Sequence, residues 1–346
     1  MLDDEKSIKM VDKSDMFGLI SSFSTLVESG YRAAMKIDAE FDDCGGLTFL
    51  GLGGSAIGGD LLNNWIGDKI PGGIRVERGF SISSPIDSDS LVVCSSYSGN
   101  TAETLNMLDQ VLKSKAKNIL LISSGGELEK ISKKKSLPLI KLKPGMPPRT
   151  TLASIVSSMA VICDELGWTK KAKSEMLAAS DSCQSYIRRN LNHRIETKDN
   201  VAKQIAHQVH GFIPVVIAPS SMEAVARRWK TQMNENAKQH CFFGSFPEIS
   251  HNEIVPWQRD ARSGMLISVL LKDNQENEEL SNRFEKFVST LSGCAKTIVV
   301  EPRGRSRIEM LMSHVLLADF VSAYSAILSN IDPTPVDEIL AFKKKR

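Results

Sequence analysis

Two loops of small and hydroxyl-bearing residues have the composition of a phosphate-binding site. The first, at 51–60, reads Gly-Leu-Gly-Gly-Ser-Ala-Ile-Gly-Gly-Asp, and the second, at 95–101, reads Ser-Ser-Tyr-Ser-Gly-Asn-Thr. Glycines let backbone amides approach an anion closely, and a helix that begins at such a loop adds its partial positive charge. Further hydrogen-bond donors come from the hydroxyl groups of Ser55, Ser96, Ser98 and Thr101. The two loops together predict a phosphorylated ligand.

A carboxylate and a histidine in the second half of the chain could transfer protons. Glu235, in Asn-Glu-Asn, lies near the end of a predicted helix that begins with the capping-box pattern of Ser220 and Glu223. Helical spacing turns Glu235 away from the apolar face of that helix, which comprises Met222, Val225, Trp229 and Met233. His251 lies in Ser-His-Asn. Residue pattern alone leaves both open to a simpler interpretation, a solvated glutamate and a histidine held by local hydrogen bonds.

Strands and helices alternate along the chain, which predicts parallel sheets that position both loops. Apolar runs in the first half predict strands near 47–52, 91–95, 119–123 and 138–142, with a further possible strand at 74–77. Both loops then leave the carboxyl edge of one sheet, where doubly wound folds bind ligands. Strands are predicted in the second half at 212–217, 265–271 and 297–300. The small-residue stretch 217–221 repeats the strand, loop and helix order, which indicates a faint duplication.

Length and composition are typical of a two-domain globular protein. The 346 residues suit an N-terminal domain at 1–165 and a C-terminal domain at 166–346, with the boundary in a charged connector at 168–200. A net charge of +2 and 24% charged residues predict neither nucleic acid nor a membrane as partner, and apolar runs such as 265–271 are too short to span a bilayer.

The cysteines and the N-terminus indicate the compartment. The six cysteines form no CxxC pair, which predicts reduced and mostly buried thiols. The N-terminus carries early acidic residues and no apolar signal segment, so we expect a cytoplasmic protein. His207 and His210 share a predicted helix face but lack nearby carboxylates or cysteines, so no metal is expected.

Six motifs occur in a fixed order along the chain. They are the stretches 51–60, 96–101, Pro-Pro-Arg-Thr at 147–150, Asn-Glu-Asn at 234–236, Ser-His-Asn-Glu at 250–253 and Asp-Pro-Thr-Pro-Val at 332–336. In this order they resemble the bifunctional phosphoglucose/phosphomannose isomerases, from about residue 45 to the C-terminus. The resemblance implies an α/β fold of two sugar-isomerase (SIS) domains, each a parallel-sheet sandwich of the doubly wound, flavodoxin-like type. It also implies a homodimer and a metal-independent aldose–ketose isomerase, without cofactor, that converts glucose 6-phosphate and mannose 6-phosphate to fructose 6-phosphate.

The same resemblance implies roles for individual residues. It implies that the sugar is contacted by Gly53, Gly54 and Ser55, and that the phosphate is contacted by Ser96, Ser98 and Thr101. The implied catalytic set is Glu235 as the base, Arg149 as the stabiliser of an enediolate, and His251 and Lys343 as the groups that open the sugar ring. Lys343 is chosen among three adjacent lysines at 343–345, and the histidine of the relatives reaches in from the neighbouring subunit. Thr334 is the nearest candidate for the threonine that gives room around C2.

Other functions fit parts of the sequence. The stretch 51–56 matches the dinucleotide fingerprint GxGxxG/A, with Glu77 near the end of the next possible strand, but that fingerprint does not explain the second hydroxyl-rich loop. A non-catalytic sugar-phosphate sensor would need the loops without a base, and usually a DNA-binding module that the first 40 residues lack. An aminosugar synthase would need a nucleophilic cysteine domain ahead of Cys44.

Overall fold

The computed structural model describes residues 1–41 and 44–344. Internal contacts divide the chain into two units, Phe23–Asp181, and Met1–Ser22 together with Ser182–Arg346. The limits predicted from the sequence, 1–165 and 166–346, differ from these units in two respects. The division falls inside the predicted connector, within helix α8 (Ala172–Tyr186), and the first 22 residues belong with the C-terminal half.

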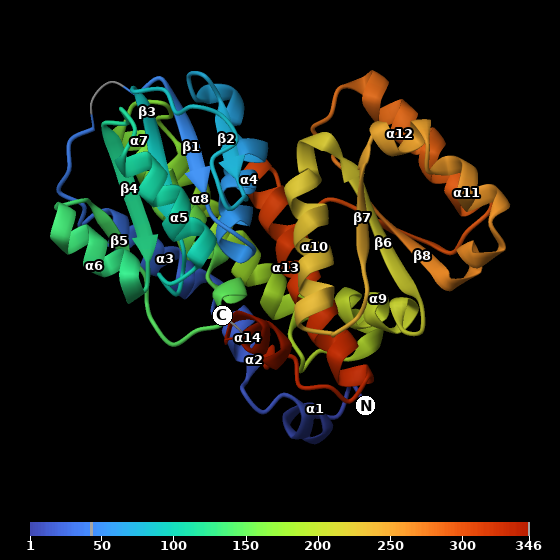
Figure 1. Cartoon of the computed structure of the whole chain (residues 1–346). Coiled ribbons are helices and arrows are strands. Elements are labelled where there is room, and N and C mark those ends of the chain that lie inside the picture. Colours follow the sequence, from blue (N-terminus) through green and yellow to red (C-terminus); the bar gives the residue numbers. More distant parts are fainter. Residues whose placement is uncertain (42–43, 345–346) are drawn as a thin grey trace. The chain divides into compact units, whose positions relative to one another are not determined.

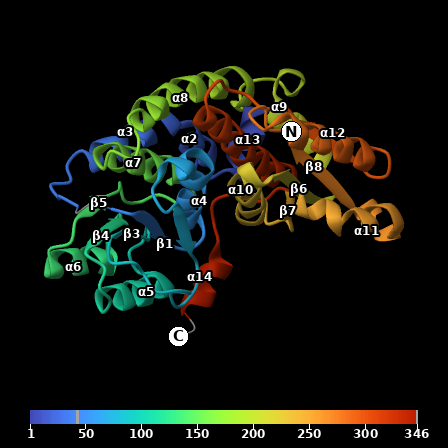
Figure 2. The same ribbon diagram turned by 90° about the horizontal axis from the view of Figure 1, so that it is seen from above.

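A five-stranded parallel sheet forms the centre of the unit Phe23–Asp181 (Figure 1). Its spatial order is β2 (Ile74–Glu77), β1 (Gly46–Leu50), β3 (Ser90–Ser95), β4 (Asn118–Ser123) and β5 (Leu139–Lys141). This is the flavodoxin-like order 2-1-3-4-5, and every predicted strand of this half is confirmed. Figure 2 shows α3 (Phe23–Ala34) and α7 (Leu152–Glu165) on one face, with α5 (Ala102–Leu112) and α6 (Gly126–Lys135) on the other.

A second parallel sheet lies in the other unit, in the order β7 (Phe242–Phe246), β6 (Ile213–Pro219), β8 (Leu266–Leu271) and β9 (Thr297–Val300). Helices α9 (Val201–Val209), α10 (Glu223–Glu235) and α13 (Arg307–Leu328) cover one face, and α11 (Ile254–Arg259) and α12 (Glu278–Ser292) cover the other (Figure 1). Each sheet places its second strand outside its first, followed by the third and fourth, which supports the predicted duplication. Strand β7 was not expected from the sequence.

Charge and aromatic contacts join the N-terminal residues to the C-terminal half. The Lys203 side chain is fully buried, and its ammonium group donates to Asp3 at 2.9 Å and to the carbonyl of Ile195 at 2.7 Å. The ring of Phe17, in α2 (Met16–Ser21), lies 4.8 Å from that of Tyr324 in α13. Together with α1 (Glu5–Val11), these contacts explain why residues 1–22 belong to this unit.

Helix α13 is the central helix of its unit. Its most apolar stretch is long enough to cross a membrane, yet 94% of that stretch is buried inside the molecule. The helix packs against α9 and α10, and the indole of Trp229 donates to the carbonyl of His314 at 3.2 Å. Such burial is typical of the core helix of a globular domain.

Candidate active site

The two predicted loops meet at the carboxyl edge of the five-stranded sheet. They follow the neighbouring strands β1 and β3, and the amide of Tyr97 donates to the Ser55 hydroxyl at 3.4 Å. Across the second loop, the hydroxyl groups of Ser96 and Thr101 lie 2.8 Å apart, while Ser98 is exposed. We call residues 51–55 and 95–101 the cradle, because they enclose one patch of amides and hydroxyls.

Glycine backbone shapes the cradle at two positions. Gly53 caps α4 (Gly54–Ile66) with φ 52° and ψ −129°, and a Cβ atom placed there would meet nothing within 4 Å. That conformation favours glycine, and the space beyond it leaves the start of α4 open to a ligand. Gly99 has φ 69°, and a Cβ atom there would lie 1.9 Å from the carbonyl oxygen of Gly125. The second loop therefore packs tightly on the loop after β4.

Arg149 lies beside the first loop of the cradle. A Cβ atom on Gly54 would lie 3.3 Å from the Cα of Arg149, whose side chain is buried. Arg149 belongs to the short 3-10 helix Pro148–Thr150. The preceding Pro147 is extended, with φ −59° and ψ 131°, whereas Pro148 begins the 3-10 turn. The two prolines therefore lead from an extended segment directly into the turn that carries Arg149.

The predicted base, Glu235, is the last residue of α10 and is half-buried. The apolar face of this helix is buried as expected, through Met222, Val225, Trp229 and Met233. Residues Ser220–Met222 make a 3-10 turn, and the α-helical backbone of α10 begins at Glu223, with Met222 at the cap position.

Lys238 joins the end of α10 to the segment that carries Thr334. Its ammonium group donates to the carbonyl oxygens of Glu235 at 2.9 Å, of Asp332 at 3.0 Å and of Pro333 at 3.0 Å. Thr334 is half-buried, and its amide donates to the Asp332 carboxylate at 3.0 Å. The structure thus brings the backbones at Glu235 and Thr334 to one side chain. Nothing in the spacing of these residues pointed to Lys238.

His251 and Lys343 occupy exposed positions on separate elements. His251 ends the 3-10 helix Glu248–His251, and Lys343 lies in the last turn of α14 (Asp337–Lys344). Of the other lysines considered with Lys343, Lys345 lies outside the described residues. Both exposed side chains are therefore open to solvent and to ligands.

Sequence comparison finds sugar-phosphate isomerases among the relatives of this chain. Residues 198–345 match the family described as the bacterial phospho-glucose isomerase C-terminal SIS domain. A bifunctional phosphoglucose/phosphomannose isomerase of Caldicellulosiruptor bescii is 29% identical, over 95% of this chain and 98% of its own length. Another, of Aquifex aeolicus, is 29% identical over 87% of this chain and 90% of its own length. Over nearly its whole length, the chain is therefore similar to bifunctional phosphoglucose/phosphomannose isomerases.

Solved structures agree with that family at the level of the fold. The C-terminal domain of glucosamine-fructose-6-phosphate aminotransferase from Francisella tularensis superposes with a TM-score of 0.75 at 15% identity, over 92% of this chain and 98% of its own. A glucose-6-phosphate isomerase like protein from Thermus thermophilus gives 0.67 at 15% identity, over 99% and 98%. The enzyme is an isomerase with the two-domain SIS fold.

Side-chain contacts also bear on the dinucleotide alternative. Glu77, the acidic residue that a ribose would require, is buried and accepts a hydrogen bond from the Ser83 hydroxyl at 2.6 Å. Arg78 beside it pairs with Asp60. Glu77 is thus engaged with its own neighbours in the chain, so the loop matches the dinucleotide fingerprint without a carboxylate free to bind a ribose.

The second unit has an equivalent edge that holds a carboxylate of the chain itself. After β6, the hydroxyl of Ser221 donates to Asp273 at 2.9 Å, and Asp273 follows β8. Arg307 donates to Asp273 at 2.5 Å and to the Ser221 carbonyl at 2.5 Å. The Asp273 side chain is only 1% exposed. The carboxyl edge of this second sheet is therefore occupied by the chain's own Asp273 carboxylate.

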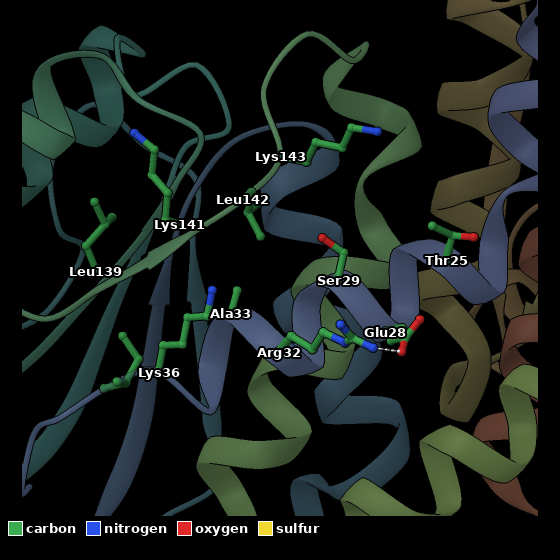
Figure 3. Close-up of a pocket in the computed structure, with 11 residues that line it drawn as sticks. Thr25, Glu28, Ser29, Arg32, Ala33, Lys36, Leu139, Lys141, Leu142 and Lys143 are labelled. Carbon is green, nitrogen blue, oxygen red and sulfur yellow. Dashed lines mark hydrogen bonds and ion pairs between the residues drawn. The ribbon is translucent and has the colours of Figure 1, made fainter.

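A groove of about 560 Å³ on α3 and β5 contains none of the predicted site residues (Figure 3). Its basic side chains are partly engaged, because Arg32 pairs with Glu28 at 2.5 Å and Lys141 pairs with Glu129. Lys143, at its rim, begins the loop that leads to Arg149. The groove thus adjoins the loop that carries Arg149, without forming part of the cradle.

The cysteines fit the prediction of reduced thiols. All six are free, and only Cys294 is exposed. Burial raises the pKa of Cys241 to about 12, which keeps that thiol protonated at neutral pH.

Proposed function

We propose that this isomerase interconverts glucose 6-phosphate and mannose 6-phosphate with fructose 6-phosphate through a cis-enediol. The observation that carries the proposal is the cradle, where an open helix start at Gly53 meets the paired hydroxyls of Ser96 and Thr101. Its supports are the named relatives, which are bifunctional isomerases. Backbone amides and hydroxyls at a helix start suit the phosphate that glucose, mannose and fructose 6-phosphates share.

Proton transfer between C2 and C1 falls to Glu235. As a carboxylate it would remove the C2 proton and return it to C1, which requires one base near both carbons. Its half-buried position supports this role, because a base partly withdrawn from water can still meet a bound sugar. Lys238 donates to the backbone carbonyl of Glu235 and thereby fixes the backbone position from which the Glu235 side chain extends.

Arg149 would stabilise the negative charge that develops on the enediolate. A guanidinium stays protonated throughout, and a buried cation acts on developing charge more strongly than one in water. Its contact with the first loop of the cradle supports this assignment, because the phosphate and the stabilising cation then share one rigid edge.

Ring opening falls to His251 and Lys343, which would exchange protons with the ring oxygen and the C1 hydroxyl. We further propose a homodimer in which His251 serves the neighbouring subunit, a role that its exposed position permits. Rotation about C2–C3 of the shared enediol would admit both epimers, with Thr334 giving room near C2. The free cysteines support a reducing, cytoplasmic location.

The test is fructose 6-phosphate formation from each hexose 6-phosphate, measured separately with purified protein in excess EDTA and without nucleotide. Conversion of both substrates is the expected result. Conversion of glucose 6-phosphate alone would remove Thr334 from the proposal, and conversion of neither would favour a sugar-phosphate sensor. D-Glucosamine 6-phosphate belongs in the same assay, because a D-glucosamine-6-phosphate 4-epimerase of Sulfolobus acidocaldarius is 31% identical over 60% of this chain and 62% of its own length.

A further inference from the structure

We propose that Tyr97 is a positioning residue that fixes the loop bearing Arg149 to the second loop of the cradle. The inference rests on the proposed isomerisation, in which Arg149 stabilises the enediolate. It concerns a residue that the resemblance did not single out, and all of its contacts lie within the unit Phe23–Asp181.

Tyr97 contacts several segments of this edge at once. Its amide donates to the Ser55 hydroxyl of the first loop at 3.4 Å. Its carbonyl oxygen accepts from the Ser124 amide at 2.9 Å and from the Ser124 hydroxyl at 2.7 Å, in the loop after β4. The residue is 7% exposed, so its backbone and ring are fixed within the sheet edge.

The phenol hydroxyl of Tyr97 binds the loop between β5 and α7 at two points. It donates its proton to the carbonyl oxygen of Lys143 at 2.9 Å and accepts from the amide of Met146 at 2.8 Å. A phenol has one proton to donate, and here that proton is used. Tyr97 therefore acts on the reaction through this loop, and its hydroxyl is not available as an acid toward the sugar.

We call the two hydrogen bonds of the Tyr97 hydroxyl, to Lys143 and Met146, the tether. The tether acts on Arg149 through the backbone. Only Pro147 and Pro148 lie between Met146 and Arg149 in the sequence. The Thr150 amide and hydroxyl donate to the carbonyl of Pro147 at 2.9 and 2.8 Å. This closes the 3-10 turn that holds Arg149. Displacement of the turn would move the guanidinium away from the enediolate, while Ser96 and Thr101 would still bind the phosphate.

Tyr97→Phe removes the hydroxyl and keeps the ring. We expect kcat to fall on the order of tenfold, the effect of losing one or two ordinary hydrogen bonds at a positioned group, with KM changed less than about twofold. Tyr324→Phe is the matched control, because it removes another buried tyrosine hydroxyl, bonded to the Leu191 carbonyl at 2.5 Å in the other unit. That control should leave both constants unchanged.

A double-mutant cycle separates positioning of Arg149 from a general structural effect. Arg149→Lys retains a positive charge and measurable turnover, and in that background Tyr97→Phe should cost less than about twofold. A full tenfold loss in both backgrounds would overturn the proposal. So would an unchanged kcat, or a higher KM at unchanged kcat, which would place Tyr97 in phosphate binding instead.

Hydrogen exchange tests the tether without any activity measurement. Amide exchange across residues 143–150 should be at least about tenfold faster in Tyr97→Phe than in the parent, with the Tyr324→Phe control unchanged. Unchanged exchange overturns the tether. An inactive parent protein with faster exchange in the variant would instead count against the isomerisation alone, so the two proposals fail in different ways.

Discussion

The guanidinium of Arg228 on α10 donates two hydrogen bonds, of 3.0 and 2.9 Å, to the carboxylate of Asp319 on α13. Arg228 is 1% exposed, so the pair is withdrawn from water. Asn236, just beyond α10, also donates to Ser322 of α13 at 2.9 Å. Helix α10, which ends at Glu235, is thus fixed to the core helix of its unit.

Asp319→Ala should destabilise the protein by about 3 to 5 kcal/mol, because it leaves a buried guanidinium without its charged partner. Chemical denaturation measures the change. Glu28→Ala is the matched control, since it breaks the exposed pair with Arg32 and should cost about 0 to 1 kcal/mol. Equal losses in the two variants would show that the buried pair contributes no more than a surface pair.

Glu235→Gln should lower kcat by about 10² to 10⁴, the usual contribution of a general base, and leave sugar-phosphate affinity largely intact. Turnover and calorimetric binding together measure this. Glu223→Gln, in the first turn of the same helix and paired with Arg227, should leave turnover unchanged. Normal turnover in Glu235→Gln would remove this residue as the base.

Ser96→Ala should weaken binding of a hexose 6-phosphate by about 1.5 to 3 kcal/mol, because it removes a hydroxyl donor to a charged group. Calorimetric titration gives the dissociation constant. Ser114→Ala removes another serine hydroxyl, one that bonds the Val111 carbonyl at 2.7 Å at the far end of α5, and should not change affinity. Equal affinities would exclude Ser96 from phosphate binding.

Buried His314 should make stability depend on pH. Complete burial lowers the pKa of His314 from 6.5 to about 4, so the unfolded chain binds a proton that the folded chain does not. Stability is therefore full above pH 6.5 and is lost as the pH falls toward 4, by up to about 3 kcal/mol. Burial also lowers the pKa of His193, which contributes loss of the same sign.

Denaturation at pH 7.5 and pH 4.5 tests this dependence. His314→Gln should reduce the difference between the two pH values markedly, whereas His240→Gln, at an exposed position, should keep it. An undiminished difference in His314→Gln would assign the acid sensitivity to other groups.

Most of the fold could be predicted because central strands of parallel sheets are buried on both faces and form continuous apolar runs. Strands β1, β3 and β4 are buried at every position, and their runs were recognised. Strand β7, Phe-Phe-Gly-Ser-Phe, lies at the sheet edge, and it was missed because Gly244 and Ser245 interrupt a short, partly exposed run.

The candidate site was predictable where composition alone carries the chemistry, as in the two loops of the cradle. The contacts that hold the surrounding structure in place could not be predicted, because they join residues far apart in the sequence. Tyr97 reaches Met146 across 49 positions, and Lys203 reaches Asp3 across 200. A tyrosine among serines and a lysine in an amphipathic helix both have ordinary explanations until the partner is known.

The carboxylate of Asp273 has a consequence for stoichiometry. The two halves share a strand order, yet the edge of the second already contains an internal anion, bound by Ser221 and Arg307. A duplicated architecture therefore does not double the capacity for ligand. A titration with hexose 6-phosphate should reach saturation at one molecule per polypeptide, with a single class of site.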